Sequence, residues 1–192
     1  MKKLTLLSEV LQYNQKFTEE KLYESFSTTK FPDKKMVIFT CMDTRLIELL
    51  HKAMNLKNGD AKVVKNAGAI LTHPFGSIMR SLLVAVYQLQ ADEVCVIGHH
   101  DCGMSALNSQ QMIEDMKERG ITQETLDTVI HSGIDLDQWL QGFDSVEESV
   151  THSVEMIRNH PLMVKDVPIH GLVIDPETGK LDLVIDGYEH TK

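Results

Sequence analysis

The sequence is short of cysteine and of long apolar runs, and each shortage excludes a class of protein. Its three cysteines in 192 residues are too few, and odd in number, for the disulfide framework of a small secreted domain. We therefore expect a cytoplasmic, reducing setting in which the thiols stay free for metal binding or chemistry. Apolar runs such as Leu82–Val86 fall far short of the roughly 18 residues that a membrane span needs. The apolar part of the opening Met1–Glu9 is likewise too short for a signal peptide.

Positive charge is also scarce, with 19 Lys and Arg against 28 Asp and Glu and a formal net charge of −9. Nucleic acids and anionic membrane surfaces attract clustered Lys and Arg, so we expect neither as a partner. The shares of hydrophobic residues, 42%, and of charged residues, 24%, are typical of a folded globular protein. At this length a single domain with a sizeable core is expected.

Short apolar runs rich in β-branched residues alternate with helical patterns, which indicates an α/β fold on a parallel sheet. The expected strands are Met36–Thr40, Ala61–Val64, Glu93–Gly98 and Pro168–Asp175. After turn residues, Lys180–Ile185 is expected to return as an antiparallel edge strand. The prediction is a central, mostly parallel sheet, about four parallel strands plus that antiparallel edge strand, flanked by helices.

The spacing of apolar residues predicts the helices that cover this sheet. It favours helices over Arg45–Met54 and over Ser77–Gln90, the second apolar nearly all round. A capping box at Ser145–Glu148 opens a further helix, which should end near His160–Pro161 because a proline follows. The stretch Ser105–Gly142 is polar with broken helical spacing, so we expect a helical excursion of residues 104–160 within the same domain.

The opening segment predicts a helical arm over residues 1–30, ahead of one α/β domain over residues 31–192. Leu4, Leu7 and Leu11 share one stripe of a helix expected over residues 4–27. A domain of this size need not cover that stripe by itself. We therefore expect the arm to contact a second copy of the chain, although docking on its own sheet is the simpler alternative.

Two cysteines and one histidine stand where strands end. Cys41 follows the expected strand Met36–Thr40, His99 follows Glu93–Gly98, and Cys102 lies three residues further on. If the two strands are neighbours, these side chains converge at the carboxyl edge of the sheet. Two thiolates and one imidazole suit Zn²⁺ and leave its fourth tetrahedral position open. The alternative is three ordinary structural residues, as we expect for Cys95 inside its strand.

Asp43 and Arg45 follow Cys41 at alternate positions. A carboxylate two residues from a metal thiolate can bind the metal or accept a hydrogen bond from metal-bound water. An arginine nearby can hold that carboxylate through a bidentate pair. The alternative is a helix start, with Asp43 or Thr44 as the N-cap and a solvated Arg45. One aspartate can serve both purposes.

Taken together, these motifs resemble the β-class carbonic anhydrases. The pattern consists of Cys41-x-Asp43-x-Arg45, then Lys65-Asn66-Ala67-Gly68, then Gly98-His99-His100-Asp101-Cys102-Gly103. By this resemblance, Cys41, His99 and Cys102 hold one Zn²⁺ per chain in a catalytic domain. Asp43 and Arg45 form the catalytic dyad, and Asp43 is also a candidate fourth metal ligand. Ala67, Gly68 and Gly103 are implied to line the substrate pocket.

The resemblance implies the reversible hydration of CO₂ to bicarbonate by a zinc-bound hydroxide. It also implies a homodimer or a higher even-numbered assembly, with small molecules as the only other partners. Because two thiolates cancel the charge of Zn²⁺, activity should climb from neutral into alkaline pH. One alternative is hydrolysis of CS₂ or COS on the same scaffold. Another is a non-catalytic zinc or redox protein with a reversible Cys41–Cys102 disulfide.

Some positions differ from the commoner form of the family. Thr44 stands where serine is usual, Lys65 where arginine is usual, and Ala69 where asparagine often follows. None of these changes removes a ligand or a dyad residue. His73 and His100 are candidate proton shuttles because histidine titrates near working pH, and the alternative for both is a surface or capping histidine.

Overall fold

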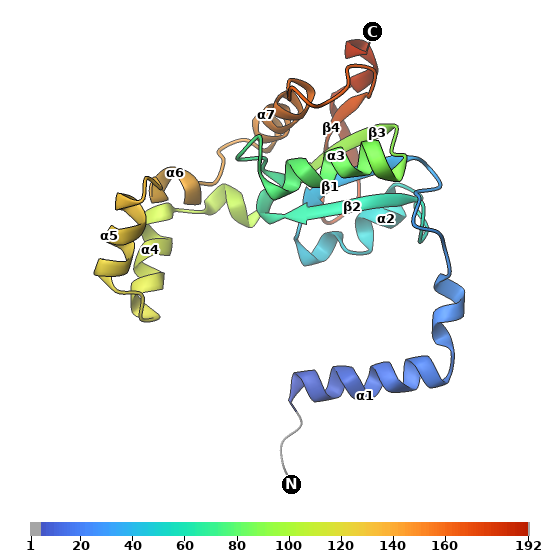
Figure 1. Cartoon of the computed structure of the whole chain (residues 1–192), viewed down its shortest axis with the longest axis horizontal. Coiled ribbons are helices and arrows are strands. Elements are labelled where there is room, and N and C mark those ends of the chain that lie inside the picture. Colours follow the sequence, from blue (N-terminus) through green and yellow to red (C-terminus); the bar gives the residue numbers. More distant parts are fainter. Residues whose placement is uncertain (1–4, 192) are drawn as a thin grey trace. The chain divides into compact units, whose positions relative to one another are not determined.

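The computed structural model describes residues 5–191, and the chain divides into two compact units, residues 1–30 and 31–192. The first unit holds helix α1 (Leu6–Glu19) and the 3₁₀ helix η1 (Leu22–Phe26) (Figure 1). The helix expected over residues 4–27 is therefore wrong in its second half. It ends because Lys21 takes a left-handed backbone with φ 54°, which an α-helix cannot continue through. Leu4 lies outside the described residues.

Helix α1 carries its apolar stripe without burying any of it. Leu7 is 67% exposed and Leu11 is 58% exposed, and α1 contains no buried residue. The aromatic rings of Tyr13, Phe17 and Phe26 contact one another in sequence along this unit. No helix among residues 5–191 is long and apolar enough to cross a membrane.

The second unit is built on a five-stranded sheet in the order β2-β1-β3-β4-β5 (Figure 1). Four strands run parallel, and β5 pairs antiparallel with β4. This confirms the predicted fold class. The strand bounds are β1 Met36–Cys41, β2 Ala61–Asn66, β3 Glu93–His99, β4 Ile169–Ile174 and β5 Leu181–Ile185.

Alternate strand residues face two separate cores. Val37 and Phe39 of β1 belong to the core under helices α3 (Ser77–Leu89) and α7 (Val146–Arg158). Ile38 of β1 belongs to the core on the opposite face. Cys95 packs in that second core with 5% exposure, as its position within a strand predicts.

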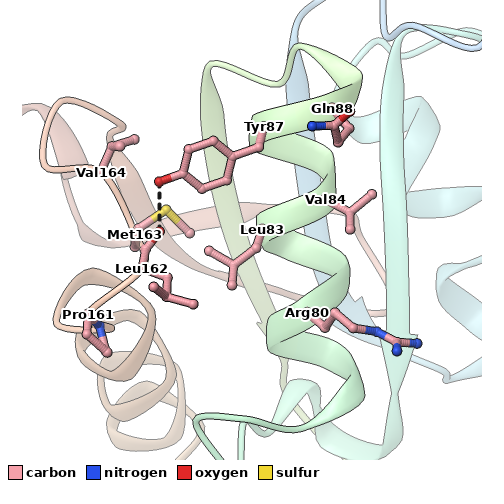
Figure 2. Close-up of a pocket in the computed structure, with 9 residues that line it drawn as sticks. All are labelled: Arg80, Leu83, Val84, Tyr87, Gln88, Pro161, Leu162, Met163 and Val164. Atoms are coloured by element: carbon pink, nitrogen blue, oxygen red, sulfur yellow. Dashed lines mark hydrogen bonds between the residues drawn. The ribbon is translucent and has the colours of Figure 1, made fainter.

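Helix α3, predicted as a helix that is apolar nearly all round, packs against the sheet with one side and leaves apolar residues of its other side exposed. Met79, Leu82 and Ala85 are buried, whereas Val84 is 43% exposed and Tyr87 is 54% exposed. The exposed side borders a shallow apolar pocket of about 500 Å³ next to residues 161–164 (Figure 2). There the Tyr87 hydroxyl donates to the Leu162 carbonyl at 2.8 Å.

The segment after β1 forms two short helices instead of the single one expected over Arg45–Met54. They are the 3₁₀ helix η2 (Thr44–Leu46) and the α-helix α2 (Leu49–Ala53). The first turn is tightened because the Asp43 carboxylate caps the Arg45 backbone N–H at 2.8 Å, and a three-residue hydrogen bond joins Leu46 N–H to the Asp43 carbonyl. The cap of this first turn is therefore a residue of the candidate site.

The expected helical excursion is present. It comprises η4 (Gly103–Ala106), α4 (Ser109–Glu118), α5 (Gln123–His131) and α6 (Leu136–Leu140). Helix α4 packs on α6 (Figure 1). The chain then enters α7, whose N-terminus is capped by the Ser145 hydroxyl. Helix α7 ends at Arg158, close to the predicted His160–Pro161.

Two strand glycines let α7 approach the sheet. A Cβ atom on Gly98 would lie 2.7 Å from Val146 Cγ2 and 2.8 Å from Val150 Cγ2. A Cβ atom on Gly171 of the neighbouring strand would lie 2.9 Å from Val150 Cγ1. Valine side chains are stiff, so neither position accepts a larger residue without a shift of α7.

We expect Gly98→Ala to lower the free energy of unfolding by about 1–3 kcal/mol, the usual effect of overpacking a filled core. Urea denaturation at matched zinc content measures the change. Gly103→Ala is the control, because nothing lies within 4 Å of the Cβ position there. Equal stability of the two variants would contradict the close approach of α7.

Candidate metal centre

The three candidate metal ligands converge because β1 and β3 are adjacent parallel strands. Cys41 is the last residue of β1 and His99 is the last residue of β3. From β1 the sheet extends to β2 on one side and to β3 on the other, so this edge is the point at which strand order reverses. The ligand atoms of Cys41, His99 and Cys102 all lie within 4.8 Å of one another, and all three residues are buried.

The His99 ring presents one nitrogen to this group. Its Nδ1 lies 2.8 Å from the His100 carbonyl, so Nδ1 carries the hydrogen and donates it. Its Nε2 is buried and has no hydrogen-bond partner among the described residues. A buried ring nitrogen without a partner is costly, and an imidazole whose Nδ1 donates to a backbone carbonyl, so that Nε2 faces the site, is the usual arrangement of a metal-binding histidine.

The two thiols lie 3.9 Å apart, from Cys41 Sγ to Cys102 Sγ. Burial raises the pKa of Cys41, but His99 and the Gly68 N–H, 3.3 Å from the sulfur, outweigh it and lower the pKa to about 7. Burial raises the pKa of Cys102 to about 11, and the neighbouring Cys41 adds to this rise. One thiolate forms readily and a second beside it does not, unless a cation lies between them. This donor set fits Zn²⁺.

Asp43 and Arg45 form a bidentate pair beside the thiols. Arg45 Nε donates to Asp43 Oδ1 at 3.1 Å, and Nη2 donates to Oδ2 at 2.9 Å. Arg45 thereby lowers the pKa of Asp43 to about 2, so the carboxylate is ionised at any working pH. Since Asp43 also caps η2, the N-cap and the arginine-held carboxylate are the same residue.

Asp43 stands next to the three ligands without being one of their group. Its Oδ2 lies 3.8 Å from His99 Nε2, and both carboxylate oxygens accept hydrogen bonds from Arg45. In this arrangement Arg45 occupies both oxygens of the carboxylate with hydrogen bonds. Its role as a fourth metal ligand stays a prediction.

The expected pocket residues flank the group. Gly68, in the 3₁₀ helix η3 (Ala67–Ala69), has φ 76°, and a Cβ there would meet Ile70 and Met104. Ala67 precedes it directly after β2, and Gly103 follows Cys102 at the start of η4. Met104, which no sequence motif marks, therefore helps to enclose the Gly68 side of the site.

The two shuttle candidates differ in their surroundings. His73 Nδ1 accepts the Phe75 N–H at 3.0 Å, which is the local capping arrangement. The His100 side chain is exposed, while its backbone carbonyl orients His99. Asp101, to which the motif assigns no role, accepts hydrogen bonds from Arg45.

Comparison with known proteins agrees with the geometry. The sequence profile of the carbonic anhydrase family matches residues 36–181. The provisionally named carbonic anhydrase YtiB of Bacillus subtilis is 62% identical over 187 residues, which cover 97% of this chain and 100% of that protein. The carbon disulfide hydrolase of Acidithiobacillus thiooxidans is 28% identical over 158 residues, covering 78% of this chain and 76% of that one.

Among solved structures, β-carbonic anhydrase isoform I of Trichomonas vaginalis superposes with a TM-score of 0.88 at 34% identity. The superposition covers 96% of this chain and 100% of that one. The chain belongs to the β-carbonic anhydrase family.

We expect about one Zn²⁺ per chain, lost in each of Cys41→Ser, His99→Ala and Cys102→Ser, because three ligands define the site. Elemental analysis measures the zinc, and the charge-transfer absorption of Co²⁺-substituted protein reports the thiolates. Cys95→Ser is the control and should keep the metal, since Cys95 packs in the core. Full occupancy in any of the first three variants would remove that residue from the ligand set.

Proposed function

We propose that this protein catalyses the reversible hydration of CO₂ to bicarbonate with one Zn²⁺ per chain. The observation that carries the proposal is the Asp43 carboxylate, fixed by Arg45 with Oδ2 at 3.8 Å from the free Nε2 of His99. A purely structural zinc site needs no ionised, oriented acceptor beside it. Hydration chemistry does, because the attacking water must give up a proton and aim a lone pair at carbon.

Each residue of the site has a distinct task in this proposal. Cys41, His99 and Cys102 would hold Zn²⁺, which, when bound, would make a water acidic enough to attack CO₂. Asp43 accepts the hydrogen bond from the attacking oxygen and so orients it. Arg45 keeps the carboxylate ionised and stops it from turning toward the metal ligands.

The surroundings of Gly68 suit a small, linear, weakly polar substrate. Gly68 has no side chain, and its neighbours Ile70 and Met104 are apolar. Cys102 and His99, which are buried as well, belong with Cys41 to the neighbouring ligand group. A site of this kind accepts CO₂ by shape and apolar contact, with Asp43 as the nearby charged acceptor.

We expect Arg45→Ala and Asp43→Ala to lower kcat/KM for CO₂ by at least about 100-fold, the scale of a lost proton-handling group. Both variants should keep their zinc, which separates this effect from loss of the metal. Arg119→Ala, an exposed arginine at the end of α4, is the control. Stopped-flow hydration between about pH 6.5 and 9 is the measurement, and native activity in Arg45→Ala would contradict the dyad.

Two alternatives use the same residues. The carbon disulfide hydrolase relative makes CS₂ the competing substrate, and parallel assays with CO₂ and CS₂ decide between the two. A redox role would require Cys41 and Cys102 to close from 3.9 Å to a bond of about 2.05 Å. Zinc content that is equal with and without reductant would exclude that role.

We further propose that the protein assembles as a homodimer or a higher even-numbered oligomer. The support is the uncovered stripe of α1, on which Leu7 and Leu11 are more than half exposed. An apolar stripe of this kind marks an interaction surface.

The double variant Leu7→Asp with Leu11→Asp should shift the assembly toward monomer at micromolar concentration, because it places charge in an apolar contact. Asn14→Ala is the control on the same helix. Light scattering measures the mass. A native protein that is monomeric and fully active would contradict the proposal.

A further inference from the structure

The guanidinium group of Arg45 is held from two sides. Asp43, which follows β1, accepts hydrogen bonds from Nε and Nη2. Asp101, which follows β3, accepts hydrogen bonds on the other side of the guanidinium. Nη1 donates to Asp101 Oδ2 at 2.8 Å, and Nη2 donates to the Asp101 backbone carbonyl at 2.8 Å. Arg45 therefore ties together the two loops that carry the metal ligands.

Asp101 reaches Arg45 twice because of its backbone conformation. Its φ is 51°, a left-handed value that is uncommon outside glycine and is tolerated by aspartate and asparagine. In this conformation the carboxylate and the carbonyl of the same residue both contact the arginine. The Asp101 side chain is 85% exposed, so packing does not explain its position.

The two aspartates use most of the hydrogen-bonding capacity of Arg45. An arginine has five N–H donors, and four donor–acceptor contacts join Arg45 side-chain nitrogens to Asp43 and Asp101. With Asp43 alone, the guanidinium would be tied only to its own loop, in which the Asp43 carboxylate also accepts from the Arg45 backbone N–H. The contacts with Asp101 fix that pair relative to the loop between His99 and Cys102.

We propose that Asp101 is a positioning residue, which holds Arg45 and, through it, the Asp43 carboxylate beside the metal ligands. Its carboxylate and its backbone carbonyl both act on Arg45. The inference rests on the proposed function, in which the direction of the Asp43 carboxylate decides how well the attacking oxygen is oriented.

Two substitutions separate the contact from the backbone conformation. Asp101→Gly removes the carboxylate and keeps φ near 51° accessible, so kcat/KM for CO₂ should fall about tenfold, as for other residues that orient a metal site from outside it. Asp101→Asn keeps an oxygen acceptor and tolerates the same backbone, so it should restore most of the activity. Zinc content should stay unchanged in both.

Asp92→Ala is the matched control. Asp92 forms an exposed ion pair with Lys35 at 3.1 Å, and neither residue contacts Arg45. Its loss tests whether removing any exposed acidic partner lowers activity. No change is expected.

A second measurement does not depend on CO₂ hydration. The chain has four arginines, at positions 45, 80, 119 and 158, so the guanidinium region of a ¹H–¹⁵N spectrum is sparse, and Arg45→Lys assigns the Arg45 signals. In Asp101→Gly the guanidinium N–H protons of Arg45 should exchange with water faster, and their chemical shifts should move toward those of free arginine. In Asp101→Asn they should resemble the native protein.

Native activity and a native Arg45 spectrum in Asp101→Gly would overturn the proposal. Equal impairment of the asparagine and glycine variants would also overturn it, since an oxygen acceptor would then not be the working feature. Loss of zinc in Asp101→Gly would also overturn it, because the residue would then act on the metal ligands and not through Arg45. If the native protein hydrated no CO₂, the proposed function would fail, and the spectrum alone would still decide whether Asp101 holds Arg45.

Discussion

The parallel pairing of β1 with β3 is the constraint on which the whole site depends. It brings Cys41 and His99 to one edge of the sheet, and the reversal of strand order there leads the following loops apart. Cys102 then needs only the short turn after β3 to face Cys41 at 3.9 Å. Any shift of one strand by a residue would turn Cys41 and its neighbours to the other face of the sheet.

Backbone carbonyls of the loop after β3 hold several side chains of the site in place. The His100 carbonyl fixes the ring of His99, the Asp101 carbonyl holds Arg45, and the Cys102 carbonyl accepts from Ser105. Carbonyl groups are the same in every residue type, so this part of the site is absent from any side-chain motif. It depends on the loop conformation, which the left-handed Asp101 helps to set.

This difference explains which features the sequence could predict. The strands were predictable because Val37, Phe39 and their neighbours form short buried apolar runs, and Cys41 and His99 were predictable because they end such runs. The end of the first helix before Lys21 was not predictable, because the sequence gives no sign that a lysine will adopt a left-handed backbone conformation. The exposed side of α3 was not predictable either, since Val84 and Tyr87 are largely apolar side chains and are nonetheless exposed.

The uneven burial of the site also bears on the kind of ligand that its residues fit. Cys41, Cys102 and His99 are almost fully buried, while the side chains of Asp43 and Arg45 are 18% and 38% exposed. Burial beside a second sulfur raises the pKa of Cys102, so two thiols alone resist a second negative charge. A divalent cation reverses that penalty, because the same low-polarity surroundings strengthen its attraction to two thiolates. The buried thiols and imidazole thus favour a divalent cation, and the partly exposed Asp43 carboxylate stays accessible to water as a hydrogen-bond acceptor.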